Sequence, residues 1–397
     1  MDSQRRTVLA LATAQALFQT GAVLILTVGG LAGQLLAPER SLATLPIASV
    51  ALGTALATIP ASLFMGRLGR RAGFVLGAGF GAAGAALAAF AVMAASFPLL
   101  CLGTLLVGFY QGFAQFYRFA AAEAATPEYR SRAISLVLAG GVVAAVAGPH
   151  LGAATRDMVP DAVYAGSFLA VVALSLVAAA LLTWAPLPSP LKATAGEEPA
   201  RPLSVVARQP RFVAAVTAAA VGFGVMVLVM TATPLSMMAH GHGVGGAATV
   251  IQWHVLAMFT PSFFTGWLVK RFGLTAMMLT GVALLFAEVM IVISGAAMPH
   301  YLAGLILLGL GWNFLYVGGS TLLTQTYRPS ERGRVQGLND FLIVAVAAVS
   351  SFSAGAMVEH LGWRGLNLAV LPVLAIAAVT IALASWAQGR DDGATAA

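Results

Sequence analysis

The chain is a succession of long apolar runs separated by short polar turns. A helix needs about 20 apolar residues to cross a bilayer, and the runs have this length. They lack the alternation of polar and apolar residues that marks the strands of an outer-membrane barrel. Only 9% of the residues are charged, whereas a soluble domain has about a quarter. We therefore predict an all-α integral membrane protein, in contact with the lipid bilayer.

Twelve transmembrane helices can be counted at this length per crossing. They lie at about residues 8–35, 43–65, 73–96, 99–124, 132–153, 162–185, 211–238, 248–269, 274–296, 301–326, 334–357 and 364–387.

The basic residues predict the orientation of these spans. With a cytoplasmic N-terminus, the outside segments hold only Arg40, Arg156 and Arg364, and Arg118 lies inside a span. The other seventeen of the 21 Lys and Arg residues then face the cytoplasm. Because cytoplasmic loops are rich in these residues, we expect both termini in the cytoplasm and the protein in a bacterial-type inner membrane. The pI of about 10.1 thus reflects topology rather than nucleic-acid binding.

One long polar connection divides the spans into six plus six. Residues 186–210 are rich in Pro, Ala and charge, which is typical of a linker. The predicted domains are a six-helix bundle over residues 1–185, a cytoplasmic linker over 186–210 and a second six-helix bundle over 211–397.

The two halves repeat each other. Arg67 and Gly69, in the turn after the second span, correspond to Arg271 and Gly273 at a separation of 204 residues. The turns after the fourth and tenth spans, PEYRSR and PSERGR, align at a separation of 202. Two matches at nearly one separation indicate an internal duplication, as in secondary transporters built from two like-oriented halves.

Twelve spans, a central linker and these basic turns resemble the major facilitator superfamily over nearly the whole chain, with bacterial drug or metabolite:proton transporters as the most similar members. The resemblance implies two pseudo-symmetric bundles around a central cavity. The family's loop motif, thought to latch the conformations, reads Gly, three residues, Asp, Arg, one residue, Gly and basic residues. Its acid is missing from both copies here. The motif positions fall on Arg67, Gly69, Arg70 and Arg71, and on Lys270, Arg271 and Gly273.

Two further features concern helix shape. Gly148 and Pro149 begin GPHLGA, which is similar to a fifth-span element of exporters in the family, and we expect a helix kink there. Pro234 removes a backbone hydrogen bond and predicts a kink near the outer end of the seventh span.

Polar stripes on apolar helices are candidate contacts for a solute. Gln15 and Gln19 share one face of the first span; the alternative is a structural interhelical hydrogen bond. Gln111, Gln115 and Arg118 form a stripe in the fourth span. It predicts a cavity wall with a cation for an anionic group, and the alternative is that Arg118 snorkels to cytoplasmic water.

The tenth span carries Trp312, Asn313 and Tyr316 near its middle. Trp312 and Asn313 align with Tyr110 and Gln111 at the same separation of 202. An aromatic ring and an amide at equal depth in each half provide stacking and hydrogen bonding. We predict a central substrate site from these residues.

Four ionisable residues inside spans are candidates for proton coupling or gating, and among them Arg118 is expected near the inner mouth of the cavity, as a gate or charge partner. A carboxyl group withdrawn from water can exchange a proton near physiological pH, which coupling requires. Asp340, with Arg118 as its expected partner, is the better candidate. Glu288 lies in a span that is peripheral in the family, and it can instead bond to a neighbouring helix. His254 can carry a proton or serve as a hydrogen-bonded structural residue.

Secondary active transport of a small organic solute, coupled to protons, is the expected function. No phosphate-cradling loop and no catalytic constellation is visible in the sequence, so we expect neither ATP hydrolysis nor an enzyme. One cysteine and two isolated histidines near an outer loop predict no metal and no cofactor. Efflux is slightly favoured; the alternative is proton-coupled uptake or exchange of an organic anion, vitamin or other metabolite. A non-transporting receptor or assembly factor is a second alternative, and we expect a monomer.

Overall fold

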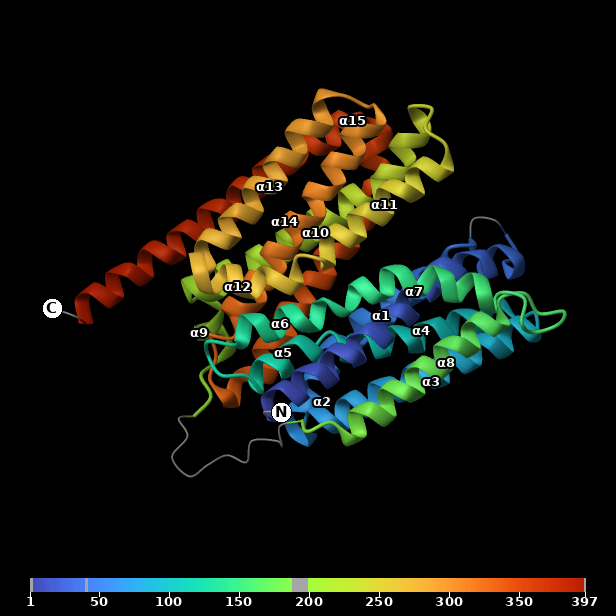
Figure 1. Ribbon diagram of the computed structural model, residues 1–397, viewed down its shortest axis with the longest axis horizontal. Helices are drawn as coiled ribbons and strands as arrows, with labels where there is room; N and C mark the ends of the chain where they lie inside the picture. Colours follow the sequence, from blue (N-terminus) through green and yellow to red (C-terminus); the bar gives the residue numbers. More distant parts are fainter. Residues whose placement is uncertain (1–2, 40–41, 188–198, 396–397) are drawn as a thin grey trace. The chain divides into compact units, whose positions relative to one another are not determined.

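The computed structural model describes residues 3–39, 42–187 and 199–395 (Figure 1). Eight helices lie in the first half of the chain: α1 (Ser3–Leu36), α2 (Leu45–Leu68), α3 (Arg70–Met93), α4 (Phe97–Ala114), α5 (Tyr117–Glu123), α6 (Arg130–Leu138), α7 (Gly140–Thr155) and α8 (Ala165–Trp184).

The second half continues the same architecture. Its elements are α9 (Leu203–Ala207), α10 (Pro210–Ala239), α11 (Val244–Phe259), α12 (Ser262–Phe272), α13 (Leu274–Ser294), α14 (Met298–Leu323), the 3₁₀ turn η2 (Pro329–Glu331) and α15 (Arg332–Thr395).

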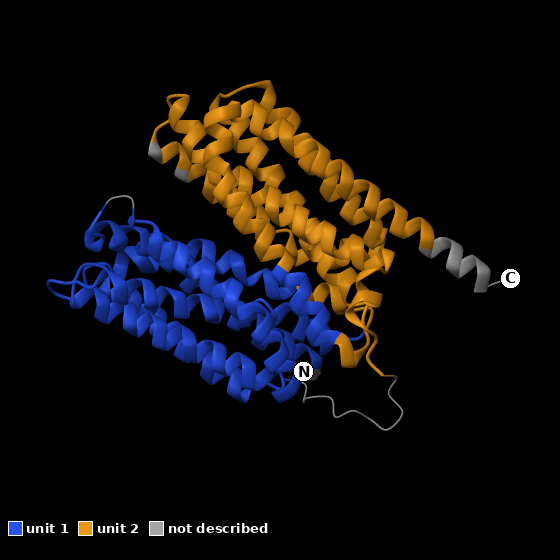
Figure 2. Ribbon diagram, turned by 180° about the vertical axis from the view of Figure 1, so that it is seen from behind, with its two compact units in different colours: residues 1–126, 136–198, 332–341 blue, residues 127–135, 199–331, 342–397 orange. Residues whose placement is uncertain are grey.

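Two compact units make up the described chain (Figure 2). Unit 1 comprises residues 1–126, 136–198 and 332–341, and unit 2 comprises residues 127–135, 199–331 and 342–397. In unit 1, α4 packs against α2 and α3, while α1 packs against α7 and α8. In unit 2, α14 packs against α10, α11 and α13.

One short segment of each half packs in the other unit. The start of α15, residues 332–341, belongs to unit 1, and the start of α6 lies in residues 127–135 of unit 2. The predicted domain boundaries therefore stay a prediction. Residues 188–198 of the predicted linker lie outside the described residues.

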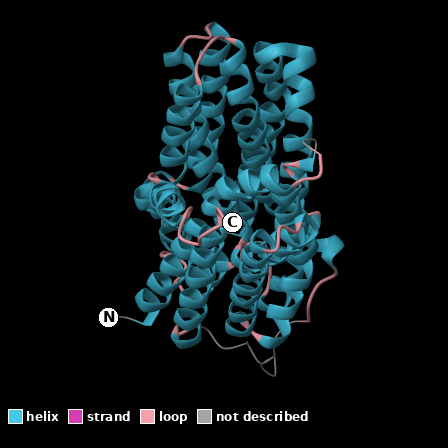
Figure 3. Ribbon diagram, turned by 90° about the vertical axis from the view of Figure 1, so that its right-hand side faces the viewer, coloured by secondary structure: helices cyan, strands magenta, loops and turns pink. Residues whose placement is uncertain are grey.

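Helices account for all the regular structure that the described residues contain, with no strand among them (Figure 3). Ten segments of the described chain are long and apolar enough to cross a membrane. The predicted eighth span is not among the ten because it consists of α11 and α12, which have 16 and 11 residues. The last two predicted spans fall within one segment, because α15 consists of two helices that meet at a kink at Gly362, where φ is 68° and ψ is 177°. The all-helical membrane architecture is confirmed, while the count of twelve stays a prediction.

Prolines interrupt some of the helices and not others. Pro261 lacks an N–H group and lies between α11 and α12, where it interrupts the hydrogen-bond ladder. In contrast, α7 continues through Pro149 and α10 continues through Pro234. The kinks expected at these two prolines stay predictions.

The two copies of the loop motif share an unusual backbone conformation. Gly69 has φ 91° and ψ 161°, and Gly273 has φ 86° and ψ 159°. Each glycine ends one helix, donates its N–H to the carbonyl four residues back and begins the next helix. A positive φ is costly for any residue with a side chain, so the repeated turn requires glycine at both positions.

Candidate functional site

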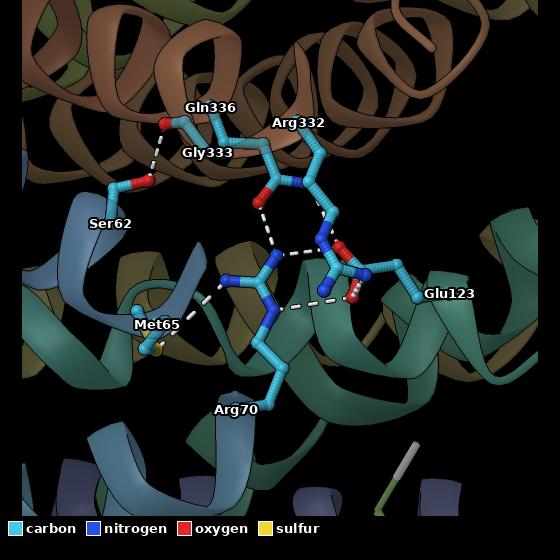
Figure 4. A network of polar contacts seen from close by, with 7 residues as sticks. All are labelled: Ser62, Met65, Arg70, Glu123, Arg332, Gly333 and Gln336. Carbon is cyan, nitrogen blue, oxygen red and sulfur yellow. Dashed lines mark hydrogen bonds and ion pairs between the residues drawn. The ribbon is translucent and has the colours of Figure 1, made fainter. Parts of the chain in front are cut away.

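Unit 1 contains a charged network around Glu123, at the end of α5 (Figure 4). Arg70, which begins α3 and is 3% exposed, donates from Nη2 to Glu123 Oε1 at 2.5 Å and from Nε to Oε2 at 3.2 Å. Arg332 of α15 donates to Oε2 at 3.3 Å. Gln336, one turn further along α15, donates to Oε1 at 3.1 Å and accepts from Arg70. Glu123 thus joins the start of α15 to α3 and α5.

Through this network Arg70 of the loop motif has a carboxylate partner, Glu123, although the acid of the motif itself is missing. The family's Asp position is Gly66, and a Cβ atom there would have nothing within 4 Å. Beside it, Ser62 donates from Oγ to the Gly333 carbonyl at 2.5 Å (Figure 4). Arg70 was predicted from the motif, but Glu123 and Gln336 were not assigned to it. The sequence did offer a signal: Glu123 is an acid at the border of the fourth predicted span, and the turns PEYRSR and PSERGR are basic.

Arg118 and Asp340 form a buried ion pair in the same unit. Their Nη2 and Oδ1 atoms are 2.5 Å apart, and their side chains are 2% and 3% exposed. Arg118 also donates to the Gln115 carbonyl at 2.6 Å, and its guanidinium lies 4.4 Å from the centre of the Phe119 ring. Asn339 donates to Asp340 Oδ1 at 2.8 Å. The expected partnership of Arg118 and Asp340 is therefore present.

The remaining unit 1 candidates differ in exposure. Gln15 is buried and donates to Gln19 Oε1 at 3.3 Å. Gln19, Gln111 and Gln115 are partly exposed. Tyr110, by contrast, is 3% exposed and lies in the core.

The Tyr110 ring is enclosed by three helices. It packs edge-on against Phe18 of α1 at 5.1 Å, and its hydroxyl is 3.4 Å from that of Tyr117. A Cβ atom at Gly81 of α3 would be 2.4 Å from this ring. Tyr110 therefore faces the interior of its own bundle, unlike the neighbouring Gln111.

Unit 2 contains a cluster of aromatic rings around α14. Trp312 and Tyr316 are stacked, with ring centres 5.0 Å apart and planes inclined by 16°. Phe223 of α10 lies 5.9 Å from Trp312 and 5.5 Å from Tyr316. Phe259, the last residue of α11, meets Trp312 edge-on at 5.6 Å. Sequence reasoning missed both phenylalanines, because in an apolar run they are indistinguishable from lipid-facing residues.

Asn313 is fully buried and bridges the break in the predicted eighth span. Its Nδ2 donates to the Met258 carbonyl at 2.7 Å and contacts Ser262 Oγ at 2.6 Å. Its Oδ1 accepts from Thr265 Oγ1 at 2.8 Å. The carboxamide therefore connects α14 to both α11 and α12.

Glu288 and His254 are both fully buried in unit 2. His254 Nδ1 is 2.8 Å from the Leu305 carbonyl of α14. Its Nε2 atom and both carboxyl oxygens of Glu288 have no hydrogen-bond partner within the described part of the chain. The structure brings neither residue into the ring cluster or the Asp340 pair.

The basic loop residues also differ between the halves. Arg71 donates to the Ala185 carbonyl at 2.9 Å, while Arg67 is exposed. In the second half, the Arg271 guanidinium lies 5.7 Å from the centre of the Phe272 ring. Lys270 is exposed.

Curated proteins with similar sequences are membrane transporters. The chain is 44% identical to the riboflavin transporter RfnT of Brucella anthropi, over 96% of each chain. It is 32% identical to the uncharacterized MFS-type transporter YdeG of Bacillus subtilis, over 97% of this chain and 93% of YdeG.

Solved structures share the fold at lower identity. The human organic anion transporter MFSD10 superposes with a TM-score of 0.78 at 15% identity, over 96% of this chain and 100% of that one. The transporter FucP gives 0.75 at 17% identity, over 96% and 99%.

The model of the Major Facilitator Superfamily matches residues 8–287 and 242–396. These two matches together cover almost the whole sequence. The members of this family are transporters rather than enzymes, and they cross the membrane many times. The chain belongs to the Major Facilitator Superfamily.

Proposed function

We propose that this protein carries riboflavin, or a closely related flavin, across the membrane by alternating access. The observation that carries the proposal is the 44% identity with RfnT along 96% of both chains. We propose uptake rather than export, because a vitamin is a solute that a cell gathers. This choice follows the vitamin alternative and not the slight preference for efflux that the sequence suggested.

The amides of unit 1 support a solute of this kind. Riboflavin joins a planar ring system to a chain bearing several hydroxyl groups. Gln19, Gln111 and Gln115 are partly exposed, and each amide offers both donors and an acceptor. A polyhydroxyl chain can use all of them, whereas a purely apolar drug cannot.

Proton coupling is proposed at Asp340. Its Oδ1 is paired with Arg118, while Oδ2 has no partner among the described residues. Protonation would remove the charge that holds Arg118, and a buried pair is weakened severely when one charge is lost. Because residues 332–341 pack in unit 1, any step that withdraws this segment must break the pair.

Topology and assembly complete the proposal. The asymmetry of Lys and Arg between the predicted loops supports cytoplasmic termini and an inner-membrane location. We propose that one chain suffices for transport, since duplicated halves within a chain can form a complete site.

Transport in proteoliposomes tests the proposal. Purified protein is reconstituted, an inward proton gradient is imposed, and the accumulation of radiolabelled riboflavin is measured. We expect accumulation that collapses when a protonophore is added and that unlabelled flavin, but not an unrelated sugar, inhibits. Efflux from preloaded vesicles under the same inward gradient would instead indicate export in exchange for protons. Binding without movement in either direction would instead support a receptor.

A further inference from the structure

The ring cluster of unit 2 has one polar atom without a partner. The indole N–H of Trp312 finds no acceptor among the described residues, although the side chain is only 2% exposed. Buried Trp N–H groups normally have a hydrogen-bond partner. If Trp312 only filled the core, its N–H would stay buried without a hydrogen bond, which is unfavourable.

The neighbouring amide does not meet it either. Asn313 directs its carboxamide to Met258, Ser262 and Thr265. Its Oδ1 accepts from Thr265, on the side of α11 and α12. The adjacent residues of α14 thus differ, because Asn313 makes its hydrogen bonds within the bundle while the Trp312 N–H has no acceptor among the described residues.

Phe223 is the exposed edge of the cluster. It is the one ring of the four that is partly exposed, since Phe259, Trp312 and Tyr316 are 7%, 2% and 3% exposed. Its neighbour Gly222 lies against Leu315 of α14, where a Cβ atom would come within 2.9 Å of that side chain. This close approach brings the partly exposed Phe223 ring against the Trp312–Tyr316 stack.

We propose that Phe223, Trp312 and Tyr316 form the subsite for the planar heteroaromatic ring of the transported solute, with the Trp312 indole N–H donating to a ring carbonyl or imine nitrogen. The proposal rests on the proposed function and adds which part of a flavin binds in unit 2. Offset stacking of flat rings favours binding. The donor selects rings that carry an acceptor on their edge over plain hydrocarbons.

The Trp312→Phe variant tests the indole N–H as a hydrogen-bond donor, and Phe223→Leu tests the aromatic ring of Phe223. Trp312→Phe keeps an aromatic ring and removes the N–H. The exposed aromatic residues Trp267 and Phe263 give the matched controls Trp267→Phe and Phe263→Leu. The probes are riboflavin; lumiflavin, which has the same isoalloxazine ring with a methyl group in place of the sugar alcohol; and ribitol, which is the sugar alcohol without the ring. Affinity is measured by calorimetry on the purified full chain, and thermal unfolding is followed in parallel.

We expect both test variants to weaken the binding of riboflavin and of lumiflavin alike, Trp312→Phe by about fivefold to tenfold, the value of one hydrogen bond. The control variants should bind as the wild type does. Ribitol should compete weakly and equally in all variants.

The outcomes separate the two proposals. Wild-type protein that binds neither flavin would overturn the proposed function. Wild-type binding of riboflavin with unchanged affinity in Trp312→Phe and Phe223→Leu would overturn the subsite alone. If Trp312→Phe does not fold, Phe223→Leu still decides, and a lowered melting temperature with unchanged affinity would assign the rings to core packing.

Discussion

Arg118 and Asp340, 222 positions apart in the chain, form a buried ion pair within one compact unit. Two charges removed from water are stable only when each has its partner and further hydrogen bonds. Gln115 and Asn339 provide some of these, while Asp340 Oδ2 has none among the residues that the structure describes. The pair therefore has one oxygen that can receive a proton.

Asp340→Asn should abolish accumulation of solute against its gradient while leaving binding largely intact. An amide cannot take up a proton, but it preserves the shape of the carboxyl group and an acceptor for Arg118. Gradient-driven uptake and equilibrium binding are measured on the same preparation. Asp157→Asn is the matched control, because this acid is 72% exposed.

Two results would contradict the assignment of Asp340. One is unchanged accumulation by Asp340→Asn. The other is loss of accumulation in Glu288→Gln with normal coupling in Asp340→Asn, which would move the proton to the buried carboxyl of α13.

Glu123→Gln should lower the free energy of unfolding by about 3 kcal/mol. The substitution removes the charge between Arg70 and Arg332, whose side chains are 3% and 12% exposed. Each would then be left without its bridging carboxylate. Thermal unfolding in detergent measures the loss, and exposed Glu359→Gln on α15 should change nothing. Equal melting temperatures for the two variants would show that the network contributes little.

Gly69→Ala and Gly273→Ala should each cost about 1–2 kcal/mol, since both glycines have a positive φ. Gly66→Ala is the internal control. Gly66 lies inside α2 with no atom within 4 Å of an added Cβ, so alanine should be neutral or stabilise the helix by up to about 1 kcal/mol. The comparison uses the same unfolding measurement. If Gly66→Ala lowered the stability as much as Gly69→Ala, the positive φ of Gly69 would not be the cause of its cost.

The fold could be predicted largely from the sequence because bilayer crossing depends on local composition. Long apolar runs and basic turns fix helices wherever they occur. The duplication was also visible, and the matched backbone of Gly69 and Gly273 gives its structural counterpart. The break at Pro261 was not predicted, although proline is the usual cause of an interrupted helix.

The candidate site was less predictable because it depends on which face each side chain takes. Tyr110 and Trp312 occupy equivalent sequence positions, yet Tyr110 packs against α1 and α3 while Trp312 joins a ring cluster. Glu123 acts with residues more than 200 positions away in the sequence. Such partnerships arise from tertiary packing, which periodicity along one helix does not contain.

Asn313→Leu should lower the free energy of unfolding by about 3 kcal/mol, because it leaves the Met258 carbonyl and the hydroxyls of Ser262 and Thr265 without their amide partner. Thr265→Val should cost less, since it removes one of these bonds. The two changes should be non-additive, with a coupling of about 0.5–3 kcal/mol in a double-mutant cycle. Exposed Thr280→Val on α13 is the control and should be additive with Asn313→Leu. Additivity between Asn313→Leu and Thr265→Val would mean that the amide does not hold α11 and α12 together, and that its burial alone accounts for the loss.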